Sequence, residues 1–165
     1  MSDTSWYPEN YYIQPTYASW PVIYYWDAMT FKQGTRRRDY WNHAWARALQ
    51  RWEPVGLDLR FRWAAEPPCP VHGLEVSIVD VPPGIGAWTQ YNPPPTCGFI
   101  EVDITTWQSA YKGRNIALLT NVITHEVGHS LGFGHGGTGV MENPVEGPWW
   151  PNSEEIEAAK AYWGT

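Results

Sequence analysis

One stretch of eleven residues constrains this chain more than any other part of it. Residues 125–135 read HEVGHSLGFGH and match the pattern H-E-x-x-H-x-x-G-x-x-H at every specified position. His125 and His129 lie one helical turn apart, so on a helix both imidazoles leave the same face and can reach one zinc ion. Gly132 can take the left-handed conformation that ends a helix, which brings His135 back as a third ligand. The stretch predicts a zinc site whose fourth position stays open for water.

The residue after the first histidine is a carboxylic acid, Glu126. It is not needed as a ligand, and beside the attacking water its carboxylate can act as the general base. Zinc lowers the pKa of water and polarises a carbonyl, so these four side chains are sufficient to cleave a peptide bond. The predicted function is therefore a zinc-dependent endopeptidase that acts on a protein or peptide substrate.

Several alternatives remain open for this motif. The histidines could form a satisfied polar cluster or a closed structural zinc site, or the chain could be a zinc-loaded but inactive relative that serves as a binding module. A structural zinc site usually recruits a fourth protein ligand, often cysteine, and none stands nearby in sequence. A purely structural site also has no use for Glu126. A further alternative keeps the zinc chemistry but acts on cell-wall peptides, and the sequence does not separate that substrate from a protein.

The motif, Met141 six residues beyond it and the final AYWG of residues 161–164 resemble the metzincin clan of zinc peptidases. Within that clan the short spacing resembles the matrixin (matrix metalloproteinase-like) catalytic domain. The resemblance implies an α+β, zincin-like fold with a mixed, twisted five-stranded sheet, an active-site helix, a methionine turn at Met141 beneath the zinc, and a C-terminal helix. Two departures leave the subfamily open. Gly136 stands where matrixins have serine, and the methionine is not followed by a tyrosine.

The resemblance also implies where a substrate lies. Residues 85–91 occupy the slot of the edge strand that pairs with an extended peptide, although an ordinary edge strand remains an alternative. The chain after the methionine, 143–150, should wrap the specificity pocket, which Trp149 and Trp150 could narrow. The substrate-binding residues predicted in this way are Gly86, Ala87, Trp88, Asn143 and Pro144. Matrixins bind calcium near this part of the fold, but the spacing of Glu101 and Asp103 fits a solvated strand face better.

Hydrophobic periodicity predicts the secondary structure between these sites. Strands are expected at 21–26, 57–63, 74–81, 85–91 and 99–104. Helices are expected at 35–52, at 115–131 and at the C-terminus, where Asn152 and Glu155 form a candidate capping pair. His43 lies on the first helix, far from the motif, and is expected to be structural or solvent-facing.

Length and charge bound the remaining possibilities. A chain of 165 residues with 43% hydrophobic content suits one domain, here expected at 20–165 behind an extended aromatic arm at 1–19. A net charge of −6 argues against nucleic acid and a membrane surface as partners. No apolar run approaches the roughly 20 residues that span a bilayer. We expect a monomer.

Two cysteines, Cys69 and Cys97, lie in proline-rich stretches. A disulfide between them is expected for an extracellular protein, with free thiols or a small second metal site with His72 as alternatives. The first residues have no basic start and no apolar stretch, so they do not form a secretory signal. The expected disulfide favours an extracellular location, and the missing signal leaves the export route open.

Overall fold

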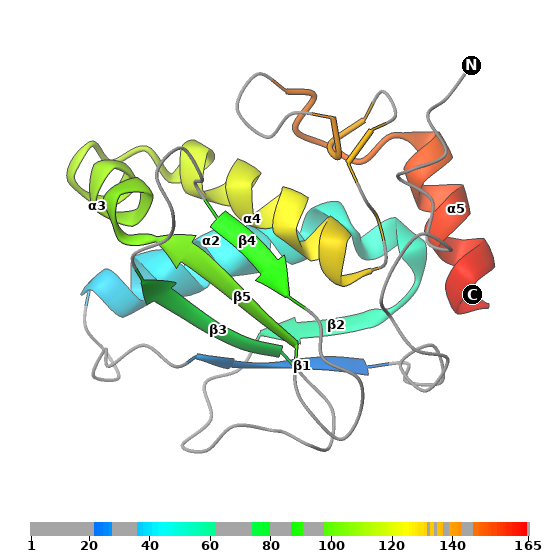
Figure 1. Ribbon diagram of the computed structural model, residues 1–165, viewed down its shortest axis with the longest axis horizontal. Helices are drawn as coiled ribbons and strands as arrows, with labels where there is room; N and C mark the ends of the chain where they lie inside the picture. The colour runs from blue at the N-terminus through cyan, green and yellow to red at the C-terminus, as the bar shows by residue number, and fades with distance from the viewer. Residues whose placement is uncertain are drawn as a thin grey trace.

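The structure is a computed structural model that places five strands in one mixed sheet (Figure 1). It describes residues 22–27, 36–61, 74–79, 87–90, 98–131, 133, 135–136, 139–142 and 147–164. Of the residues singled out above, several lie outside this part of the chain: the arm at 1–19, Cys69, His72, Gly86, Cys97, Gly132, Asn143 and Pro144. The predictions made for these residues stay predictions.

The strand order across the sheet is β2-β1-β3-β5-β4. Strands β2, β1, β3 and β5 run parallel to one another, and β4 runs antiparallel to β5 at one edge. Each strand overlaps one of the ranges predicted from the sequence. Their bounds are Val22–Asp27 (β1), Asp58–Phe61 (β2), Leu74–Val79 (β3), Ala87–Gln90 (β4) and Gly98–Asp103 (β5).

Within the described residues four α-helices accompany the sheet, and a short 3-10 helix, η3 (Glu53–Val55), follows the first of them. The α-helices are Arg36–Arg51 (α2), Ile104–Lys112 (α3), Ile116–Ser130 (α4) and Ser153–Trp163 (α5). Side chains cap three of them, because Asp103, Asn115 and Asn152 each accept a hydrogen bond from a backbone amide in the first turn. The capping box predicted for the last helix is confirmed, since Asn152 and Glu155 bond reciprocally.

The predicted fold class needs a first correction in its helices. The sequence predicted two long helices and a C-terminal helix, and it extended the fifth strand to residue 104. In the structure β5 ends at Asp103, whose side chain accepts from the amide of Thr105 at 3.2 Å and starts α3 at once. Helices therefore occupy more of the described residues than strands do.

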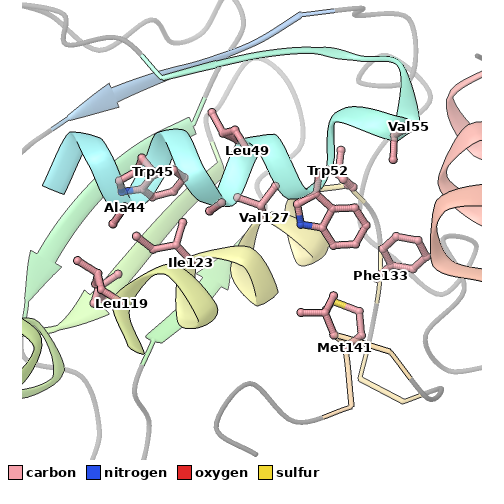
Figure 2. Close-up of a cluster of buried hydrophobic side chains, with 14 of the residues drawn as sticks. Ala44, Trp45, Leu49, Trp52, Val55, Leu119, Ile123, Val127, Phe133 and Met141 are labelled. Atoms are coloured by element: carbon pink, nitrogen blue, oxygen red, sulfur yellow. The ribbon is translucent and has the colours of Figure 1, made fainter. Parts of the chain in front are cut away.

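The core lies between α2 and α4, which pack side by side along one face of the sheet (Figures 1 and 2). Trp41 and Trp45 of α2, with Trp52 just after it, form a tryptophan stripe that faces α4. The facing apolar stripe of α4 consists of Leu119, Ile123 and Val127. All six side chains are fully buried. This burial fixes the rotation of α4 about its axis, so the face that carries the histidines turns away from the core. The residues of this interface include Trp45, Leu49, Leu119, Ile123 and Val127.

The last tryptophan of the stripe, Trp52, anchors the far end of the core. Its indole Nε1 donates to the carbonyl of Thr124 at 2.8 Å, and its ring stacks on Phe133 with centroids 5.8 Å apart. Figure 2 shows Trp52, Phe133 and Met141 grouped beside the C-terminal half of α4. The residues that follow α4 are thus packed back against the helix.

None of the helices in the described ranges is both long enough and apolar enough to cross a membrane.

We expect the α2–α4 interface to dominate stability. Ile123→Ala should lower the free energy of unfolding by about 2–5 kcal/mol, because Ile123 is fully buried and its removal leaves a cavity. The same substitution at Ile104, which is 37% exposed, should cost less than about 1 kcal/mol. Urea denaturation of the two variants tests this, and equal losses would contradict the assignment of the core.

Candidate metal centre

Three histidines converge at the C-terminal half of α4. The Nε2 of His129 lies 3.1 Å from the Nε2 of His125 and 3.2 Å from that of His135. His125 and His129 come from successive turns of α4, whereas His135 comes from the chain that turns back after the helix. The three residues can hold a metal ion between them. They are the one such group within the described part of the chain.

Backbone carbonyls fix the orientation of the two helical rings. The Nδ1 of His125 lies 2.9 Å from the carbonyl oxygen of Val140, and the Nδ1 of His129 lies 2.8 Å from that of Phe133. A carbonyl oxygen can only accept, so each Nδ1 carries the proton and each Nε2 keeps its lone pair. Two lone pairs that face one another at 3.1 Å repel, and a cation between them removes that repulsion. Such outer hydrogen bonds are typical of metal-ligating histidines.

Burial keeps these two histidines neutral. Desolvation lowers the pKa of His125 to about 4, with the proximity of His135 adding to the effect and the bond to Val140 opposing it. Desolvation, with His125 nearby, lowers the pKa of His129 to about 3. A histidine binds a metal only as the neutral ring, so the site holds its ligands in the required form at neutral pH.

Exposure increases from one histidine to the next. His125 is 2% exposed, His129 is half-buried and His135 is exposed. The group is therefore closed on the side of the core and accessible on the side of His135. No fourth histidine, cysteine, aspartate or glutamate of the described residues joins it.

Glu126 follows His125 on α4 and is only 4% exposed. Its carboxylate is not a member of the three-histidine group, and its role as general base stays a prediction. Glu126 lies on a rigid, packed helix, next to His125 in sequence.

Met141 lies beneath the helix that carries the histidines. It is fully buried, and a Cβ added to Gly128 would collide with its sulfur. The same Cβ would lie 2.9 Å from Cζ2 of Trp52. Gly128, which lies between His125 and His129 in sequence, therefore permits the close approach of Met141 to α4.

The structure places two of the predicted substrate-binding residues on the edge strand. Ala87 and Trp88 open β4, where they pair with Val102 and Glu101 of β5, and β4 packs against α4. Figure 1 shows β4 in front of α4. The prediction of an antiparallel edge strand at this position is confirmed. Asp103 caps α3, and calcium at Glu101 and Asp103 stays the less favoured alternative that the sequence left open.

Arg51, a buried residue that the sequence analysis did not identify, links Trp149 and Trp150 to helix α4. Nη1 of Arg51 donates to the side chain of Asn121 at 2.7 Å and to the carbonyl of Trp149 at 3.0 Å. Its guanidinium lies 5.0 Å from the ring of Trp150. Desolvation, and secondarily the charge of Arg47, lowers the pKa of Arg51. Trp149 and Trp150 are 46% and 61% exposed, so they form an aromatic surface next to α4.

Glu155 is the second residue whose role sequence reasoning missed. The capping-box spacing indicated that its side chain bonds the amide of Asn152, which it does at 3.0 Å. The spacing gave no sign that the same carboxylate also accepts from the amides of Val140 and Met141, both at 3.0 Å. These two residues lie fourteen and fifteen positions away, so only the fold reveals the contact.

The lowered pKa values predict acid sensitivity of the metal-free protein. Between about pH 6.5 and pH 4 the unfolded chain takes up protons on these histidines and the folded protein does not. The stability that they contribute is full above pH 6.5 and is lost as the pH falls. Each histidine should steepen the dependence by up to about 1.4 kcal/mol per pH unit.

Urea denaturation across this range measures the effect. His125→Gln should flatten the pH dependence, whereas His43→Gln, at an exposed position on α2, should leave it unchanged. Glu155, whose buried carboxyl has a raised pKa, is common to both variants and cancels. Identical profiles for wild type and His125→Gln would contradict the lowering of the pKa of His125 by burial.

Comparison with known proteins gives a likeness of fold and no family. No family model and no curated protein matches the chain. Among the solved structures that match is a chain of the GM1-bound form of the ECX AB5 holotoxin, with a TM-score of 0.59 and 16% identity, covering 87% of this chain and 80% of that one. At this identity the likeness concerns the fold alone.

The predicted fold class is corrected accordingly. The resemblance named it metzincin- or zincin-like, after a matrixin domain, whereas the structural neighbour reported above is a chain of a holotoxin. The sheet and helices are therefore described by their own topology, with the holotoxin chain as the structural reference.

Proposed function

We propose that the chain is a zinc-dependent endopeptidase. The observation that carries this proposal is the convergence of the Nε2 atoms of His125, His129 and His135 on one side of α4, open toward His135. A tetrahedral zinc with bonds of about 2.0–2.1 Å separates its nitrogen ligands by about 3.3 Å. The separations of 3.1 and 3.2 Å are close to this value. The donor set of three neutral imidazoles also suits zinc.

The chemistry divides between the ion and the chain. Zinc, when bound, would polarise a substrate carbonyl and make water more acidic. Glu126 would take the proton from the attacking water and deliver it to the leaving nitrogen. The accessible side at His135 admits the substrate, and the free edge of β4 at Ala87 and Trp88 would hold its backbone extended. The resemblance of the eleven-residue motif to that of metzincin peptidases supports the same chemistry.

A second candidate function is a zinc-stabilised binding module without catalysis. The exposed rings of Trp149 and Trp150 favour it, because large exposed aromatic residues mark recognition surfaces. Glu126 argues against it, since a binding module has no need of a buried carboxylic acid next to His125 in sequence. A peptidase that acts on cell-wall peptides rather than on proteins uses the same residues.

Hydrolysis of a quenched fluorescent casein by the purified protein, with the bound metal quantified, tests the proposal. Glu126→Ala should keep one zinc per chain and lower kcat/KM by about 10²–10⁴-fold, because only the general base is lost. A chelator should abolish hydrolysis in the wild type. Glu53→Ala, which removes an exposed glutamate of η3, should retain full activity.

The outcomes separate the candidates. Undiminished turnover in Glu126→Ala would refute the mechanism. Stoichiometric zinc with no cleavage of casein and cleavage of cell-wall peptides would identify the narrower peptidase. Stoichiometric zinc with no cleavage of either substrate would contradict the peptidase and leave the binding module.

A further inference from the structure

A buried carboxylate on α5 lies behind the chain that carries Met141. Glu155 is 1% exposed, and both of its carboxylate oxygens accept hydrogen bonds. Oε1 accepts from the amides of Asn152 and Val140, and Oε2 accepts from the amide of Met141, each at 3.0 Å. The first bond belongs to the capping box of α5, whereas the other two join α5 to the segment 139–142.

That segment in turn holds a ring of the metal group. The carbonyl of Val140 accepts from Nδ1 of His125 at 2.9 Å, while the amide of the same residue donates to Glu155. The carbonyl of Met141 accepts from the amide of Gly136 at 3.1 Å, one residue beyond His135. The carboxylate of Glu155 is thus two hydrogen bonds from the first histidine.

The packing leaves the segment little freedom to move. A Cβ added to Gly139 would overlap the carboxylate of Glu155, and Met141 fills the space below Gly128. The segment 139–142 is therefore held on one side by the carboxylate of Glu155 and on the other by the packing of the Met141 sulfur against α4. A displacement of Val140 would tilt the ring of His125.

The arrangement specifies a carboxylate rather than any capping side chain. A capping box works with glutamine as well as glutamate, so the helix start alone does not require a charge. Three amide donors require acceptors on both oxygens, and the amide nitrogen of a glutamine would face one of the donors. Burial of a carboxylate is costly unless it is fully hydrogen-bonded, and bonds to an ionised acceptor are the strong ones.

We propose that Glu155 is a positioning residue for the metal centre, which fixes Val140 so that its carbonyl orients the ring of His125. This inference rests on the proposed zinc site and not on peptide hydrolysis. Helix α5 would thus influence the affinity of the three histidines for zinc.

The zinc dissociation constant, measured by competition with a chromophoric chelator, tests the proposal. Glu155→Gln should weaken zinc binding by about 10–100-fold, the effect of losing a partner that orients a ligand. Glu157→Gln, which removes an exposed glutamate of the same helix, should bind zinc as the wild type does. The absorption spectrum of the cobalt-substituted protein should change in Glu155→Gln, because the ring of His125 tilts.

Two further variants separate positioning from general stability. Tyr40→Phe removes a hydrogen bond to Ala110 far from the metal group, so it should lower the melting temperature and leave zinc affinity unchanged. Glu155→Asp keeps the charge and should restore part of the zinc affinity and the cobalt spectrum. It also serves as the test if Glu155→Gln does not fold.

Wild-type zinc affinity and cobalt spectrum in folded Glu155→Gln would overturn the proposal, as would wild-type affinity in Glu155→Asp if that is the only variant to fold. A protein that binds zinc but cleaves nothing would refute the peptidase and leave this measurement intact. If the wild type is an active peptidase and Glu155→Gln binds zinc with wild-type affinity, the positioning role of Glu155 is refuted and the peptidase proposal stands.

Discussion

The local structure around the motif depends on one constraint, that two imidazole rings must offer their Nε2 lone pairs to the same point. A helix alone does not achieve this, because a histidine ring can rotate about its side-chain bonds. The carbonyls of Phe133 and Val140 remove that freedom by accepting from Nδ1 of His129 and His125. The position of the ligands therefore comes from α4, and their orientation comes from the chain that follows it.

The rigidity of α4 has its own physical source. One side of the helix is buried against the tryptophan stripe of α2, and Trp52 donates across the interface to the carbonyl of Thr124, the residue before the first histidine. Arg51 adds a second link, to Asn121. Both donors come from the end of α2, so the core fixes the histidine-bearing turn from behind. A site that needs ring positions accurate to a fraction of an ångström gains from such support.

Local patterns in the sequence predicted most of what local chemistry determines. The period-two alternation located β2 and β3, the apolar stripe located α4, and the reciprocal spacing of Asn152 and Glu155 located the start of α5. The motif predicted which histidines meet. Contacts between distant residues were not predictable: the carbonyl partners of the rings have no side-chain signature, and Glu155 reads as a capping residue only. Helix α3 was missed because Asp103 and residue 104 continue the strand pattern until the aspartate turns to cap the amide of Thr105.

The gradient of exposure across the three histidines bears on what such a site can do. His125 is enclosed, with its ring bonded to Val140, and His135 is open to solvent. A structural metal site gains from closure on every side, because each protein ligand adds to the stability of the fold and excludes competitors. Here the interior side supplies orientation and neutral ligands, and the exterior side leaves room for an incoming group. The proposed peptidase would use the buried Glu126 as its base. The proposed hydrolysis at a metal would require such an asymmetry, which would be a disadvantage in a site that served stability alone.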